Sequence, residues 1–173
     1  MLFAKKPYAV GRKMKMFSVG DHIAHPMHGA GIIDRIEEKK VNGTVRKYYV
    51  FKMPVGGMLV MIPMDTCSEI GVRPIISSDE ADRLMEQFSH IECEMDSNWN
   101  RRYRENMLRI KSGDLLEVAR VVKGLMARDC EKGLSTGERK MLRSAKQILI
   151  SEFVLSQNSN YEDVEDRIIT ALA

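Results

Sequence analysis

The spacing of hydrophobic residues changes character near residue 75. Between residues 16 and 73 the apolar residues form short runs separated by turn residues, which predicts strands over 19–25, 31–37, 47–52 and 58–62. Asn42-Gly43 lies between two of these runs and is typical of a tight β-hairpin. Short strands joined by tight turns predict a small antiparallel β-barrel, because a closed sheet leaves no free edge.

From residue 77 onward the apolar residues recur at helical spacing. Ser77 and Glu80 have the spacing of a capping box, in which each residue satisfies a backbone amide of the other. Ser135 and Glu138 repeat that pattern. We therefore expect one helix to begin at each serine, the first ending near residue 89 and the second near residue 156.

Three further helices are predicted, over 99–111, over 114–132 and as a short helix after Asn160. The segment 114–132 is apolar on most sides, which predicts the central buried helix. The fold class expected is α+β with two domains. The first is the β-barrel, and the second is a compact all-α bundle of about five helices.

Charge is unevenly distributed between these parts of the chain. The net charge of +3 combines 27 basic and 24 acidic residues, and 13 of the basic residues lie between 99 and 146. We expect a basic N-terminal extension over 1–15, a β-domain over 16–73, an acidic linker with the first helix over 74–98, and a helical domain over 99–173. A basic excess within one domain favours a polyanionic partner.

The basic block opens with Asn98-Trp99-Asn100-Arg101-Arg102-Tyr103-Arg104, which holds the only tryptophan. Cations suit the phosphates of nucleic acid, and a large apolar ring can wedge between base steps. The spacing also permits a second interpretation. On a helix, Trp99 shares a face with Tyr103, Met107 and Ile110, so it could be an ordinary core residue.

The helix predicted after Ser135 has one basic side. Arg139, Lys140, Arg143 and Lys146 share that side, and apolar residues occupy the opposite side. Together with the arginines of the tryptophan segment, these residues form a candidate surface for DNA phosphates. The candidate DNA-binding residues are Trp99, Arg101, Arg102, Arg104, Arg139, Lys140, Arg143 and Lys146.

Patterns typical of enzymes and metal sites are not found in the sequence. The three cysteines are widely spaced without a CxxC pair, and His22, His25 and His28 have no further ligand at suitable spacing. There is no nucleotide-binding glycine loop or serine elbow. We expect neither enzymatic activity nor a cofactor. No apolar run is long enough for a membrane helix or a secretory signal, so a cytoplasmic location is expected.

Three blocks of the sequence resemble the CarD family of bacterial transcription regulators. They are the segment 16–29, with Met16-Phe17-Ser18-Val19-Gly20-Asp21 and His25-Pro26-Met27-His28-Gly29, the tryptophan segment, and the segment 134–149. The resemblance implies a Tudor-like, or SH3-like, domain related to that of transcription-repair coupling factor, which binds the RNA polymerase β subunit. It also implies a helical domain on promoter DNA, with Trp99 as a minor-groove wedge that stabilises the open complex.

On the polymerase side, Lys39 matches a position that is basic in relatives, and an exposed strand edge is expected at Val60, Met61 and Ile62. DNA binding should have little sequence specificity, because phosphate contacts do not specify sequence. Two alternatives belong to other functional classes. An adaptor without DNA binding would show no salt-dependent affinity for DNA, and a stand-alone repressor would bind one operator tightly without polymerase.

Overall fold

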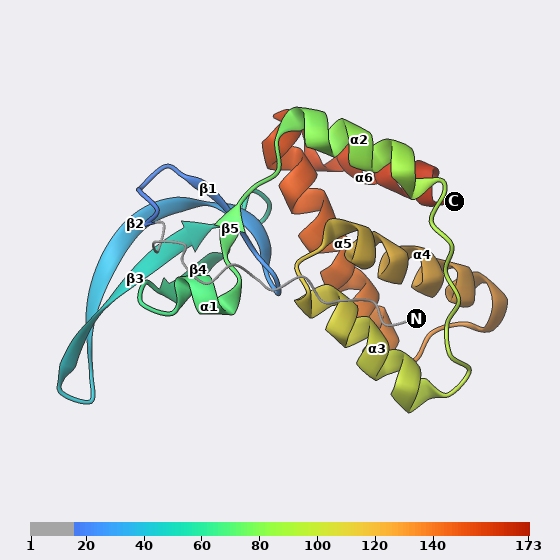
Figure 1. Ribbon diagram of the computed structural model, residues 1–173, viewed down its shortest axis with the longest axis horizontal. Coiled ribbons are helices and arrows are strands. Elements are labelled where there is room, and N and C mark those ends of the chain that lie inside the picture. The colour runs from blue at the N-terminus through green and yellow to red at the C-terminus, as the bar shows by residue number, and fades with distance from the viewer. Residues whose placement is uncertain (1–15) are drawn as a thin grey trace, which may run out of the picture.

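A computed structural model describes residues 16–173 and shows a twisted β-sheet beside a cluster of helices (Figure 1). The predicted basic extension over 1–15 lies outside the described residues. Along the chain, the strands precede almost all of the helices. The strands are β1 (His22–His25), β2 (Gly29–Val41), β3 (Thr44–Lys52), β4 (Leu59–Pro63) and β5 (Arg73–Pro74), with the one-turn helix α1 (Cys67–Ile70) before β5.

The sheet is antiparallel and open, with strand order β4-β3-β2-β1-β5. The predicted hairpin is confirmed, and Asn42 and Gly43 have the positive φ angles, 49° and 81°, that a tight hairpin turn needs. The prediction of a closed barrel is wrong. β4 and β5 form the two edges of the sheet and do not pair with each other.

One face of the sheet is covered by other parts of the chain, which explains why the sheet does not need to close. Phe17 precedes the sheet, Cys67 belongs to α1 and Val72 follows that helix. All three pack in one core with strand residues such as Tyr49 and Phe51. This core buries the apolar face of the sheet. A closed barrel would need β5 to pair with β4, and β5 has only two residues.

The helices agree closely with the predicted ones. They are α2 (Ser78–Phe88), α3 (Trp99–Lys111), α4 (Leu115–Lys132), α5 (Thr136–Gln157) and α6 (Tyr161–Leu172). Both predicted capping boxes are present, at Ser77 and Ser135. α2 packs with the other helices through Ala81 and Phe88, so the acidic segment contributes its helix to the same core.

Two helices form the centre of the helical part. α4 is buried as predicted, with Val118, Val122 and Leu125 inaccessible to solvent. α5 was not predicted to be central, yet its second half is buried on most sides. That half lies between the other helices and the sheet, where α5 packs against β2 (Figure 1).

A small number of polar contacts join the sheet to α5. The Ala30 amide donates to Ser151 Oγ at 2.9 Å. Arg73 forms a two-point ion pair with the buried Glu152, with N–O distances of 2.6 and 3.0 Å. Glu152 also accepts from the Ile76 amide at 3.0 Å. One carboxylate on α5 therefore holds both β5 and the chain segment that leads to α2.

Gly29 permits this close approach, and its replacement tests the junction. Its φ is +89°, and an added Cβ would lie 2.5 Å from Ser151 Oγ and 3.1 Å from Ile148 Cα. Gly29→Ala should therefore lower the free energy of unfolding by about 1–3 kcal/mol more than Gly20→Ala does. Gly20 is the matched control, because its φ is +91° and nothing lies within 4 Å of the added Cβ. Equal losses in thermal or denaturant unfolding would contradict the tight junction.

Candidate nucleic-acid interface

Trp99 is the first residue of α3, and its indole lies partly exposed at the protein surface. It retains 43% of its accessible area. One face of the ring stacks on Tyr103, with ring centroids 5.1 Å apart. Its Nε1 donates to Ser135 Oγ at 3.1 Å, which joins the N-terminus of α3 to that of α5. The interpretation of Trp99 as a core residue is therefore wrong, while Tyr103, Met107 and Ile110 do pack on the helical core as their spacing predicted.

Arg102 is a correction to the predicted DNA-binding set, because its side chain is buried. Only 1% of its surface is accessible. Its guanidinium makes two contacts of 2.7 Å with Oε1 of Glu138, which is also buried. A third nitrogen donates to the carbonyl oxygens of Asp96 at 2.8 Å and Ser97 at 3.1 Å. Helical geometry explains the difference from its neighbours, since Arg102 points inward, toward α5.

The environment of Glu138 keeps its carboxylate charged. Burial alone would raise the pKa of Glu138, but hydrogen bonds from Arg102 and from Ser135 outweigh that effect and hold the pKa below its usual value. Because the pKa of Glu138 is lower in the folded protein than in the unfolded chain, where it is about 4.3, the charged carboxylate stabilises the folded state at pH values above about 4.3. This stabilisation is lost as the pH falls through the folded-state pKa. At neutral pH the buried ion pair is therefore fully formed.

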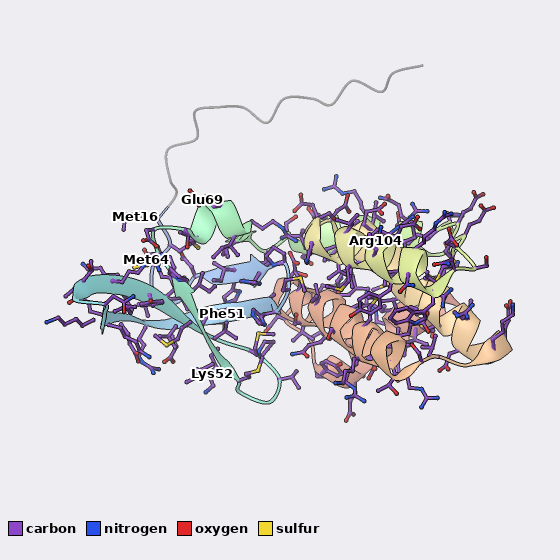
Figure 2. All side chains as sticks on the ribbon, turned by 90° about the horizontal axis from the view of Figure 1, so that it is seen from below. Met16, Phe51, Lys52, Met64, Glu69 and Arg104 are labelled. Atoms are coloured by element: carbon purple, nitrogen blue, oxygen red, sulfur yellow. The ribbon has the colours of Figure 1, made fainter. Side chains whose placement is uncertain are left out.

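Arg101 and Arg104 lie on the exposed side of α3. Figure 2 shows Arg104 on this helix, in the helical half of the molecule. The first turn of α3 contains no acidic residue. Helix N-termini carry partial positive charge, so cations there are usually unfavourable and anions favourable. This arrangement concentrates positive potential beside Trp99. It is suited to an external anion.

Arg139, Arg143 and Lys146 line a shallow hollow of about 340 Å³ between α5 and α6. Tyr161 and Glu165 of α6 form part of its wall, and Glu165 lies 3.8 Å from the Lys146 ammonium. Lys140 is exposed nearby on α5 but does not line the hollow. The structure thus brings three of the four predicted cations of α5 into one surface depression.

The residues expected to bind polymerase lie on two different parts of the sheet. Val60, Met61 and Ile62 belong to β4, which is an edge strand as expected. The side chain of Ile62 is buried, so only its backbone is available to a partner strand. Lys39 is exposed two strands away, where it pairs in register with Arg46.

Within residues 16–173 no helix is both long and apolar enough to span a bilayer, and no three potential metal-binding side chains lie together. His25 and His28 are close, with ring centroids 4.5 Å apart. Burial and the neighbouring His28 lower the pKa of His25 to about 4. His25 Nδ1 accepts from the Met27 amide at 3.0 Å, and its ring stacks on Phe51, so it packs as a neutral side chain.

Comparison with known proteins agrees with this architecture. Residues 83–169, half of the chain, match the family described as CarD, C-terminal domain. The chain belongs to the CarD family. Residues 17–76 match the family described as CarD-like/TRCF RID domain, so the sheet and its covering segments correspond to the first CarD module. This match implies an interaction with RNA polymerase.

A curated relative supports the same assignment. The chain is 42% identical over 137 residues to "Putative transcription factor YdeB" of Bacillus subtilis (strain 168), covering 79% of this chain and 90% of that protein. The protein is thus a CarD-family transcription regulator, and these similarities are to transcription factors rather than to enzymes.

Sequence reasoning missed the polar partners of this CarD-family site. The capping box indicated Ser135 and Glu138 as the start of a helix, but not their contacts with Trp99 and Arg102. Neither was the pair of Arg73 and Glu152 predicted. Glu152 was a usable signal, because it lies among apolar residues in the second half of α5 and a carboxylate on a buried face needs a cationic partner.

Arg102 and Arg101 give a direct test of the buried ion pair. Arg102→Ala leaves the buried Glu138 carboxylate with Arg128, 3.7 Å away, as its nearest remaining cation, and should cost about 3–5 kcal/mol of unfolding free energy. Arg101 has a side chain that is 73% exposed and only a 3.9 Å contact with Asp96, so Arg101→Ala should change stability by less than about 0.5 kcal/mol. Chemical denaturation of both variants measures the difference. Equal stability of the two variants would show that Arg102 is not a core residue.

Proposed function

We propose that this CarD-family regulator contacts the RNA polymerase β subunit through its sheet and promoter DNA through its helical half, and that Trp99 stabilises the open complex as a minor-groove wedge. The observation that carries the proposal is the position of Trp99. Its indole is substantially exposed at the junction of two helix N-termini, beside the exposed Arg101 and Arg104.

A wedge can favour melted DNA for a simple energetic reason. Unstacking a base step costs a few kcal/mol, and a ring that enters the gap recovers part of this cost only in the distorted DNA. The ring therefore interacts better with the open complex than with intact duplex, and such a difference is what shifts an equilibrium. An indole already fixed against Tyr103 loses little further freedom when it inserts.

The basic surface supports a DNA contact without sequence preference. Arg101, Arg104 and the cations of α5 are suited to phosphates, whose neutralisation releases counterions and gives salt-dependent affinity. Contacts from these cations to phosphates carry no direct information about sequence. Position on the promoter would then come from polymerase rather than from DNA sequence.

The polymerase contact is proposed for the free edge of β4. An edge strand has unpaired backbone groups that can add to a strand of a partner. Leu59 at the start of this strand is exposed, whereas Val60 and Met61 are partly covered. Once the sheet is bound to polymerase, the helical half is held close to the promoter DNA, so its effective concentration there is high. Two weak contacts on one polymerase–promoter complex would therefore strengthen each other.

A measurement of DNA binding is enough to distinguish the proposed function from that of an adaptor. An adaptor would bind polymerase but show no salt-dependent affinity for duplex DNA. A stand-alone repressor would prefer one operator over random sequence in the absence of polymerase. The proposed function predicts weak DNA binding with a steep salt dependence and little preference between sequences.

The cations of α5 are tested by charge reversal. The double variant Arg139→Glu, Arg143→Glu should weaken DNA binding by a similar factor on unrelated sequences. The slope of log Kd against log salt concentration should decrease by an amount that corresponds to the loss of about two phosphate contacts. The control is Arg83→Glu with Arg167→Glu, which makes the same charge change at exposed positions of α2 and α6. The control should keep most of the salt slope. If both double variants behave alike, only net charge matters and the proposed surface is wrong.

Trp99→Ala tests the wedge itself. Because Trp99 is partly exposed, its truncation should cost about 1 kcal/mol of stability rather than the 3–5 kcal/mol of a buried aromatic. The variant should bind polymerase but no longer prolong the lifetime of open complexes. Leu108→Ala is the control, since Leu108 lies on the same helix and is 64% exposed. An unchanged open-complex lifetime with Trp99→Ala would remove the wedge from the proposal.

A further inference from the structure

The Ser135 hydroxyl makes three hydrogen bonds at once. It donates to Glu138 Oε2 at 3.0 Å, and it accepts from the Glu138 amide at 3.2 Å and from Trp99 Nε1 at 3.1 Å. A hydroxyl has one proton and two acceptor lone pairs, so these contacts use its full capacity. The charged carboxylate accepts the one hydrogen bond that the hydroxyl can donate, which leaves an oxygen lone pair for the indole N–H.

Glu138 connects this hydroxyl to the chain segment that leads into α3. Its other oxygen accepts from Arg102, and Arg102 in turn donates to the carbonyl groups of Asp96 and Ser97. These carbonyls lie three and two residues before Trp99, respectively. The indole ring and the backbone that carries it are thus held from two sides by one network.

From this geometry we infer that Ser135, Glu138 and Arg102 are positioning residues for Trp99. They hold the indole in the orientation in which it enters DNA, and the inference rests on the wedge function proposed above. Arg102 accordingly belongs to the DNA-binding apparatus without touching DNA.

Close packing restricts the ring from a third direction. Gly137 lies in the first turn of α5, and a Cβ added there would lie 3.7 Å from both Trp99 Cζ2 and Tyr103 Cε2. The stacked ring pair therefore rests directly on the helix backbone. Rotation of the indole away from this position would break the bond to Ser135 and the stacking on Tyr103 together.

The capping box of α2 shows which features are additional to an ordinary cap. Ser77 and Glu80 repeat the same bonds, with Ser77 Oγ donating to Glu80 Oε2 at 2.9 Å and accepting from the Glu80 amide at 3.2 Å. Glu80 is exposed, whereas Glu138 is 2% exposed and paired with Arg102. Among the described residues, only the cap of α5 bonds an aromatic side chain.

Ser135→Gly separates the two roles of this serine. Glycine is almost as good as serine at a helix N-cap, so the helix start is largely retained while the hydroxyl that holds the indole is lost. Ser135→Thr keeps the hydroxyl and serves as the rescue variant. Ser77→Gly is the matched control in the other capping box. Trp99 is the only tryptophan of the chain, so its fluorescence anisotropy in the free protein reports the freedom of this ring directly.

We expect Ser135→Gly to lower the anisotropy of Trp99 and to reduce the protein's prolongation of open-complex lifetime about three- to tenfold, the effect of one ordinary hydrogen bond on an equilibrium. Its melting temperature should fall somewhat further than that of Ser77→Gly, because the buried Glu138 carboxylate loses a hydroxyl donor. Ser135→Thr should restore both the anisotropy and the lifetime, and Ser77→Gly should alter neither.

Unchanged anisotropy in Ser135→Gly would overturn the inference, whatever happens to the open complex. A changed anisotropy with unchanged lifetime would overturn it as well, provided that Trp99→Ala shortens the lifetime in the same assay. If Trp99→Ala leaves the lifetime unchanged, the wedge function itself fails. The anisotropy then still decides whether Ser135 holds the indole.

Discussion

The buried ion pair between Arg102 and Glu138 is the interaction on which the helical site depends. It joins the first turn of α3 to the first turn of α5, with guanidinium contacts of 2.7 Å to a carboxylate that is almost inaccessible to solvent. Two charges buried in this way are favourable only when both are fully paired. The pair therefore imposes one arrangement of the two helix starts, and with it one position for Trp99.

α5 transmits this constraint across the molecule. Its second buried carboxylate, Glu152, pairs with Arg73 of the sheet, 14 residues beyond Glu138 along the same helix. At about 1.5 Å per residue, the two ion pairs are separated by ~21 Å of continuous helix. The sheet and the tryptophan are thus connected by a stiff element rather than by a flexible linker. In a two-point binder such stiffness favours simultaneous contact when the spacing matches the target.

Much of the fold followed from local pattern. The capping boxes, the Asn-Gly hairpin and the apolar spacing located the helices and main strands, because each depends on residues close in sequence. The open sheet was missed because its closure depends on what covers the apolar face, here Phe17 and α1. The exposure of Trp99 was left undecided by its spacing. Helical spacing places its neighbour Arg102 nearer the apolar side, but the partner that buries it, Glu138, lies 36 residues away and could not be identified from the sequence.

The central claim is that this CarD-family protein favours the melted promoter. The most direct test is the lifetime of open complexes formed by RNA polymerase on one promoter, measured with a competitor that traps free polymerase, in the presence and absence of the protein. We expect a longer lifetime when the protein is present, because the proposed wedge would interact better with distorted DNA than with intact duplex. A lifetime that is unchanged or shorter at saturating protein would contradict it.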